Sequence, residues 1–150
     1  MAGTDTTQAG KIIYVSDDIP LQTIRYAVTD ILGNLVYFTD EAEQYIKYSR
    51  GTRRTQKYVL NYLHKISAIL KDPSIVIIDP EDISERTLVY YKEIHVKEKQ
   101  KQELFALIVN ANKERIVYNF HPQESGKVKF WKSQPKVLYL KRGHKRANYL

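Results

Sequence analysis

The stretch ELFALIVNANKERIVYNFHP, residues 103–122, predicts two neighbouring strands of an antiparallel sheet. Its first part, ELFALIVNA, is apolar on both faces, which is typical of a strand in the middle of a sheet. Only the short polar connection NANKE leads to the second strand, and connections of this length join antiparallel neighbours. The stretch therefore predicts the central hairpin of a sheet.

Further strands and two helices are predicted around this hairpin. The Gly-Asn pair of VTDILGNLVYF (28–38) predicts a hairpin turn. Thr39 stands before DEAEQYI as a helix cap, so a helix begins there and ends near Gly51, and a second helix runs from about Thr55 to Leu70. Other runs rich in β-branched and aromatic residues predict strands, namely KIIYVSD (11–17), TIRYAV (23–28), SIVII (74–78), RTLVYYKEIHV (86–96) and KVKFW (127–131).

This order predicts an α+β fold in which two N-terminal helices pack on one face of a mostly antiparallel sheet. With 150 residues, the chain has the length of a single domain. We expect a disordered leader over residues 1–10, the domain over residues 11–132 and a basic C-terminal tail over residues 133–150.

Several classes of protein are excluded or disfavoured by what the sequence lacks. There is no cysteine, so disulfides, thiolate zinc sites and cysteine nucleophiles are excluded. Neither H-E-x-x-H nor a phosphate-binding glycine loop is present, so we expect no metal and no cofactor. No apolar run is long enough to cross a bilayer, and the N-terminus lacks the pattern of a secretion signal. A cytoplasmic protein without a membrane partner is the prediction.

The basic residues are concentrated in two segments. Residues 47–71 and 127–150 contain 15 of the 24 Lys and Arg residues and no acid, although the net charge of the chain is only +7. Tyrosines and the single tryptophan are interleaved with these cations, as a surface that binds single-stranded nucleic acid requires. The segregation predicts a polyanionic partner, either RNA or another nucleic acid, or an acidic protein.

The chain resembles the phage-type branch of the barnase–EndoU–colicin–RelE ribonuclease-like superfamily. Three segments carry the likeness over roughly residues 28–131: DILGNLVYFTDEAEQYI, AILKDPSIVIIDPEDISERTLVYYKEI and LFALIVNANKERIVYNFHP. The resemblance implies a metal-independent nuclease in which Arg and Lys bind the phosphate, two side chains transfer protons, and the 2′-hydroxyl attacks phosphorus. In this comparison Tyr45 stands where the branch has a helical histidine. Asn119 and His121 stand where it has a hydroxyl residue and a tyrosine.

Candidate catalytic residues lie on the last strand of the stretch quoted first. Strict alternation places Arg115, Asn119 and His121 on one polar face, and Ile116, Tyr118 and Phe120 on a core face. His121 titrates near neutral pH, so it suits acid–base catalysis, whereas an Asn cannot transfer a proton. The alternative is a structural or merely exposed histidine.

Arg86 and Lys92 share one face of RTLVYYKEIHV and suit the charge of a phosphorane. The alternative is cross-strand pairing with acids such as Glu103. If the site is catalytic, we expect Arg86, Lys92, Arg115 and His121 to converge on one concave face of the sheet.

The predicted nucleic-acid contacts are basic residues outside this constellation. They form a cluster between the helices, the polar face of the second helix and the region around Trp131: Arg50, Arg53, Arg54, Lys57, His64, Lys129 and Lys132. Two functions follow as hypotheses. The first is a metal-independent ribonuclease-like domain, toxin-like or catalytically degraded, and the second is a non-enzymatic module that binds nucleic acid or an acidic partner protein.

Overall fold

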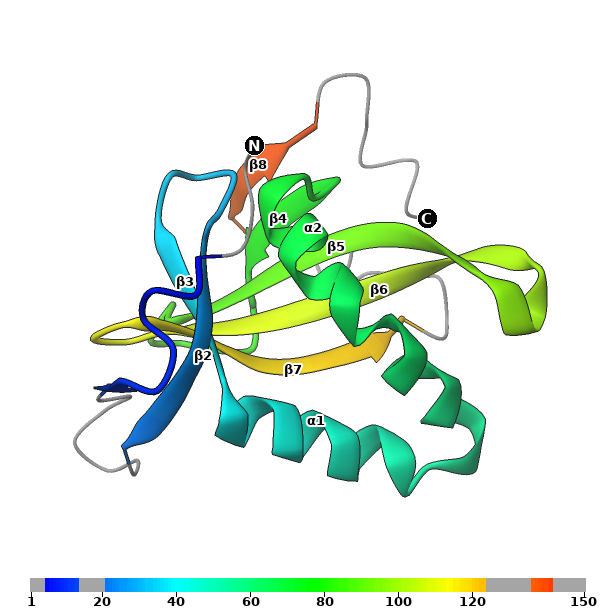
Figure 1. The fold of residues 1–150 in the computed structure, drawn as a ribbon. Helices are drawn as coiled ribbons and strands as arrows, with labels where there is room; N and C mark the ends of the chain where they lie inside the picture. The colour runs from blue at the N-terminus through cyan, green and yellow to red at the C-terminus, as the bar shows by residue number, and fades with distance from the viewer. Residues whose placement is uncertain (1–4, 14–20, 124–135, 142–150) are drawn as a thin grey trace.

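The computed structural model describes residues 5–13, 21–123 and 136–141. Among these residues, a mixed sheet of eight strands forms the centre of the fold, in the order β1-β2-β3-β7-β6-β5-β4-β8 (Figure 1). Three helical segments follow β3 and lead into β4. The strands are β1 (Ile12–Ile13), β2 (Gln22–Thr29), β3 (Leu35–Thr39), β4 (Ile75–Ile78), β5 (Thr87–Val96), β6 (Lys101–Ala111), β7 (Arg115–Pro122) and β8 (Val137–Leu140).

The predicted arrangement of two N-terminal helices on a mostly antiparallel sheet is wrong. The fold is α+β, but three strands precede the helices, and the sheet is mixed because β3 pairs with β7 in parallel. This parallel pair is short, with Val36 opposite Arg115 and Tyr37 opposite Ile116. The pairing joins segments that are far apart in the chain, so no local pattern of residues predicts it.

The predicted hairpin between residues 28 and 38 is confirmed, with β2 and β3 antiparallel. Its turn needs the left-handed backbone of Gly33, whose φ is +83°. The buried carboxylate of Asp30 holds the turn by accepting from the amides of Leu32 and Asn34, at 3.0 and 2.8 Å. The hydroxyl of Tyr90 on β5 also donates to Asp30, so the turn is tied to the central strands.

Helix α1 (Asp40–Gly51) begins as predicted at Thr39, whose hydroxyl accepts from the amide of Ala42 at 3.1 Å. Its buried residues Ala42, Ile46 and Arg50 follow one another at spacings of four. This is the spacing of a single helical stripe, so the stripe that faces the core ends on an arginine.

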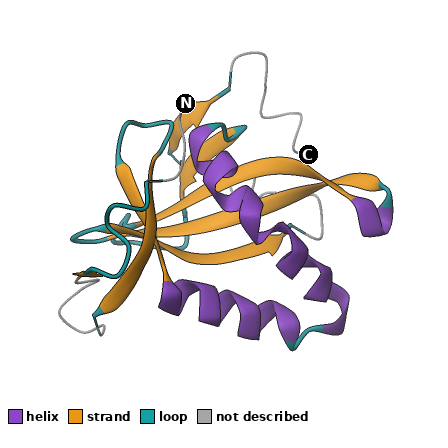
Figure 2. Cartoon of the chain, viewed as in Figure 1, coloured by secondary structure: helices purple, strands orange, loops and turns teal. Residues whose placement is uncertain are grey.

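The predicted second helix exists, but in two forms. Arg54–Lys65 is a long 3₁₀ segment, η1, and Ile66–Lys71 is the α-helix α2. A 3₁₀ helix has three residues per turn, so residues three apart align. Gln56, Val59 and Tyr62 form such a buried row. Figure 2 shows α1, η1 and α2 as successive helical segments along the sheet.

The sheet has two unlike faces. On the helix face, residues of α1, η1 and α2 form one core cluster with strand residues such as Phe105, Leu107 and Phe120. The opposite face has a smaller cluster, which contains no described helical residue: Ile75, Ile77, Val89, Tyr91 and Ala106. We call this second side the open face. It leaves strand side chains accessible where no described helix packs.

Both predicted terminal segments contain described residues. Asp5 forms a bridge with Ala27 within the predicted leader, and β8 pairs with β4 within the predicted tail. The predicted strand KVKFW lies outside the described residues. Among the described residues, no helix combines the length and the apolar character that a membrane span requires.

Candidate functional site

A β-bulge in β7 determines which side chains reach the open face. Asn119 pairs with Ile108 and Val117 pairs with Val109, so Tyr118 is an extra residue without a partner on β6. An extra residue reverses the alternation of side chains beyond it. The expected core position of Tyr118 is therefore wrong, and its side chain is 53% exposed.

Burial of two apolar residues accounts for the bulge. Val117 and Phe120 both belong to the core cluster on the helix face and are 1% and 0% exposed. They are three positions apart, so a regular strand would turn one of them outward. Burying such a side chain stabilises the fold by about 1.5–3 kcal/mol, which exceeds the loss of one ladder position.

A pocket of about 480 Å³ lies on the open face next to the bulge. It is lined by side chains from four strands or their ends: Asp79, Thr87, Ile108, Asn110, Tyr118 and His121. Five of these residues can donate or accept a proton or a hydrogen bond beside the apolar Ile108, so the described lining offers several polar groups that fix the orientation of a ligand.

His121 is half-buried in this pocket, opposite Ala106 of β6. Its Nδ1 lies 3.0 Å from the carbonyl oxygen of Pro122. A carbonyl can only accept, so this contact requires a proton on Nδ1. In the neutral ring the lone pair is then on Nε2, and Nε2 is the atom that can take up a proton.

Tyr118 joins the pocket to α1. Its ring stacks on that of Tyr45, with centroids 5.3 Å apart and planes inclined by 26°. A hydrogen bond to Tyr45 raises the pKa of the Tyr118 hydroxyl, and partial burial raises it further. Tyr118 therefore keeps its proton at neutral pH. Tyr45 and Tyr48 of α1 are also exposed, and Tyr48 follows Tyr45 by three residues, so the two rings are neighbours on the surface of α1.

Asn110 provides a buried acceptor in the pocket. Among the described residues, none donates a hydrogen bond to its Oδ1. A buried amide oxygen without a donor is costly, so a bound molecule or water that donates there is favoured. The neighbouring Thr87 is oriented by its own bond to Asp82, at 2.6 Å. Asp79 accepts from the amide of Glu81 at 2.9 Å.

The residues predicted to be catalytic lie on two sides of the sheet. His121 and Asn119 lie on the open face, where the Oδ1 of Asn119 accepts from the amide of Phe120 at 2.8 Å. Arg115 pairs with Val36 and Ala111, which belong to the helix face. The expected convergence on one concave face is therefore wrong.

Arg86 and Lys92 are engaged elsewhere. Arg86 precedes β5 and its Nη1 donates to Asn112 Oδ1 at 3.2 Å. Lys92 Nζ is 3.0 Å from a carboxylate oxygen of Asp72, and this hydrogen bond is the main reason that the pKa of Asp72 is lowered. The partner of Lys92 is thus Asp72 after α2, and not Glu103, whose carboxylate meets Lys99 at 3.0 Å.

The predicted nucleic-acid contacts differ in their access to solvent. Arg50 is 3% exposed and donates to Gln56 in the core, so it does not form part of an accessible surface. The other described members of the set are exposed, namely Arg53, Arg54, Lys57 and His64. Lys129 and Lys132 lie outside the described residues.

Tyr118, Tyr45 and Asn110 are the site residues that sequence reasoning missed. The spacing of Val117 and Phe120 is the signal that could have revealed Tyr118, because two bulky residues three apart cannot both be buried on one face of a regular strand. No local signal places Asn110 and Tyr118 in one pocket, since that placement depends on the register of β6 and β7.

The described residues contain no group of three or more His, Asp or Glu residues arranged to hold a metal ion. Comparison of the chain with models of known protein families, with curated proteins and with solved structures finds no match.

Proposed function

We propose that this domain binds RNA on the open face and that the pocket with His121 cleaves the phosphodiester without a metal ion. The observation that carries the proposal is the bulge of β7, which brings Tyr118 and His121 into one pocket and sets Tyr118 against Tyr45. The segregated basic charge of the chain supports a polyanionic ligand.

His121 and Tyr118 have complementary proton chemistry. Nε2 of His121 takes the proton of the ribose 2′-hydroxyl, whose oxygen then forms a bond to the adjacent phosphorus. The bond from phosphorus to the 5′-oxygen breaks, and that oxygen receives the proton of the Tyr118 hydroxyl. The products are a 2′,3′-cyclic phosphate and a free 5′-hydroxyl, so no water or metal ion takes part in this step.

Other groups at the site support recognition of RNA. The Oδ1 of Asn110 can accept from an amino group of a base or from a ribose hydroxyl, which would supply the donor that the described residues lack. The exposed rings of Tyr45 and Tyr48 offer faces on which bases can stack, an interaction worth about 1–3 kcal/mol per base.

The test is cleavage of a short single-stranded RNA in EDTA, with analysis of the product ends. We expect cyclic phosphate ends, and a loss of roughly 100-fold or more in rate for His121→Ala and for Tyr118→Phe. His95→Ala is the matched control, because His95 is exposed on β5, does not line this pocket and is not one of the predicted nucleic-acid contacts. Cleavage that needs a divalent ion, or that survives His121→Ala, would refute the assignment.

A second function is favoured by one observation. Among the described residues, no Lys or Arg lines the pocket, and the predicted catalytic cations Arg86 and Lys92 contact Asn112 and Asp72 instead. A non-enzymatic module that binds nucleic acid would then use the exposed cations of η1. In that case RNA is bound but not cleaved, the affinity is unchanged by His121→Ala, and it falls with Arg53→Ala and Arg54→Ala. Measuring both RNA cleavage and RNA affinity for these variants separates the two functions.

A further inference from the structure

Part of β5 has a neighbouring strand on one side only. β6 pairs with β5 along its whole length, from Thr87 to Val96. β4 pairs only with Leu88–Tyr91, because the chain before β4 passes through Asp72 and Pro73 to α2. Among the described residues, the segment Lys92–Val96 therefore presents a free edge on the side of β4.

The backbone of this segment is oriented for a further strand. In an antiparallel ladder, the amide and carbonyl of one residue point to the same side, and successive residues alternate. The amide of Asp79 donates to the carbonyl of Thr87 at 2.8 Å, so the odd-numbered residues of β5 face β4. Continuing this alternation, Glu93 and His95 direct their amides and carbonyls away from β6, toward the free edge.

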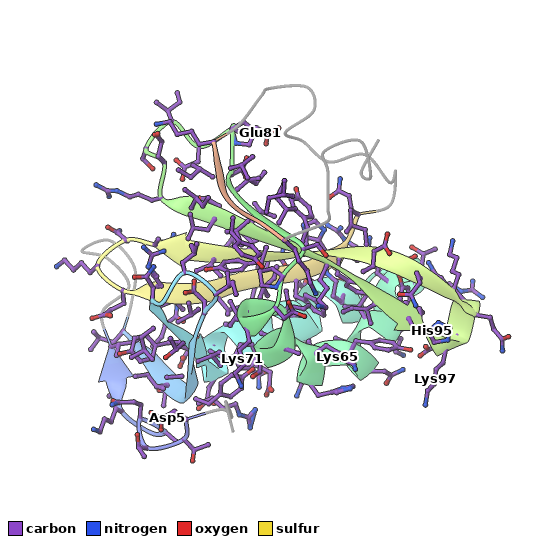
Figure 3. All side chains as sticks on the ribbon, turned by 90° about the horizontal axis from the view of Figure 1, so that it is seen from above. Asp5, Lys65, Lys71, Glu81, His95 and Lys97 are labelled. Carbon is purple, nitrogen blue, oxygen red and sulfur yellow. The ribbon has the colours of Figure 1, made fainter. Side chains whose placement is uncertain are left out.

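A pocket of about 200 Å³ lies between this edge and the helical segments. Its apolar lining is Ala68, Ile69 and Ile94, and the other lining residues are Lys65, Lys92, Glu93 and His95. In Figure 3, Lys65 and Lys71 on the helical side and His95 and Lys97 at the strand lie along the same side of the molecule. An edge with a side-chain pocket beside it has the two elements that strand addition uses.

The charge around the edge favours an acidic occupant. Residues 47–71, which supply Lys65 and Lys71, contain no acid. Lys65 and Lys97 are exposed, whereas Glu93 is the single acid that lines the pocket among the described residues. Exposed strand edges in natural proteins carry cations that discourage association between copies. The same cations attract a chain of opposite charge.

We propose that an acidic, extended segment of a partner protein adds to the sheet along Lys92–Val96, in line with β4. Its backbone bonds to the amides and carbonyls of Glu93 and His95. One apolar side chain enters the pocket over Ile69 and Ile94, and an acidic side chain two positions away shares its face and meets Lys65. This surface is separate from the pocket that holds His121, so the inference does not depend on ribonuclease activity.

The probe is a fluorescein-labelled peptide, Asp-Glu-Thr-Leu-Thr-Glu-Asp, titrated into the full-length protein and followed by anisotropy. We expect saturable binding that weakens about fivefold or more with Lys65→Glu, because an attractive contact becomes repulsive. Lys11→Glu makes the same charge change beside β1, at the opposite edge of the sheet, and leaves binding unchanged. A peptide with both threonines replaced by proline cannot form the ladder and does not bind.

Amide hydrogen exchange locates the contact and tests the alternatives. Saturating peptide is expected to slow exchange at Glu93 and His95 by about tenfold or more, with no such change at Lys11. Protection of both amides before any peptide is added would overturn the proposal, because the chain itself or a second copy would occupy the edge. Displacement of the peptide by single-stranded RNA that itself leaves Glu93 and His95 unprotected would also overturn it, since the surface would then bind polyanions without strand addition.

Discussion

Arg50 and Arg53 are three residues apart and look equivalent in the sequence, but the structure predicts opposite effects of their removal. Arg50 ends the buried stripe of α1 and donates to Gln56, whereas Arg53 is exposed between α1 and η1. We therefore expect Arg50→Ala to lower the free energy of unfolding, and under the second proposed function, in which RNA contacts the exposed cations next to η1, we expect Arg53→Ala to weaken RNA binding.

The loss in free energy of unfolding that we expect for Arg50→Ala follows from the contacts of Arg50. Truncation to alanine removes two buried methylenes beyond Cβ, at about 0.8 kcal/mol each. It also removes a hydrogen bond from a charged donor, worth about 1.5 kcal/mol or more, and leaves the side chain of Gln56 without this donor. The sum is a loss of about 3 kcal/mol, whereas Arg53→Ala should change stability by roughly 0.5 kcal/mol or less.

Two measurements separate the roles. Urea unfolding gives the stability of each variant, and anisotropy with a single-stranded RNA at several salt concentrations gives the number of phosphate contacts. Each lost contact reduces the slope of log K against log salt by about 0.7, which we expect for Arg53→Ala alone. An Arg50→Ala variant with the stability of the parent and a reduced salt slope would refute the assigned roles.

Three further predictions concern stability and are tested by urea unfolding. Tyr90→Phe removes the donor to the buried Asp30 and should cost about 2 kcal/mol, with no change in the urea dependence of unfolding. Thr39→Ala should cost about 1 kcal/mol because the first turn of α1 loses its cap, and Thr39→Ser, which restores a hydroxyl, should recover most of it. Hydrogen bonds to its carboxylate, of which that from the side chain of Ser84 contributes most, lower the pKa of Asp82 to about 2. The resulting stabilisation is present at pH values above the ordinary pKa of 3.8 and is lost as the pH falls toward 2. After allowance for solvent screening we expect a loss of about 1 kcal/mol over this range, which Asp82→Asn should abolish.

The local elements were predictable because their signals are local. Thr39 caps α1, Gly33 allows the turn between β2 and β3, and the run of residues 103–111 is a strand in the interior of the sheet. The burial of Arg50 was also within reach, since it lies four residues after Ile46 on the apolar stripe of α1.

The candidate site was only partly predictable. His121 was identified from its titration range and its position on the last predicted strand, and it lines the pocket on the open face. Its predicted companion Arg115 is on the other side of the sheet, because the bulge at Tyr118 lies between them. Alternation counted along a single strand assumes a regular ladder, and an inserted residue cannot be seen without the partner strand.

The sequence by itself determined the helix and turn signals, the concentration of basic charge in two segments and the absence of cysteine chemistry, since each depends on residue type and short spacing. The tertiary structure alone decided the parallel contact of β3 with β7, the register of β6 and β7 and the edge of β5 that no described strand covers. The physical reason is that these features depend on which distant apolar surfaces bury one another. Burial of Val117 and Phe120 on one face requires the bulge, and the bulge turns Tyr118 from the core to the pocket.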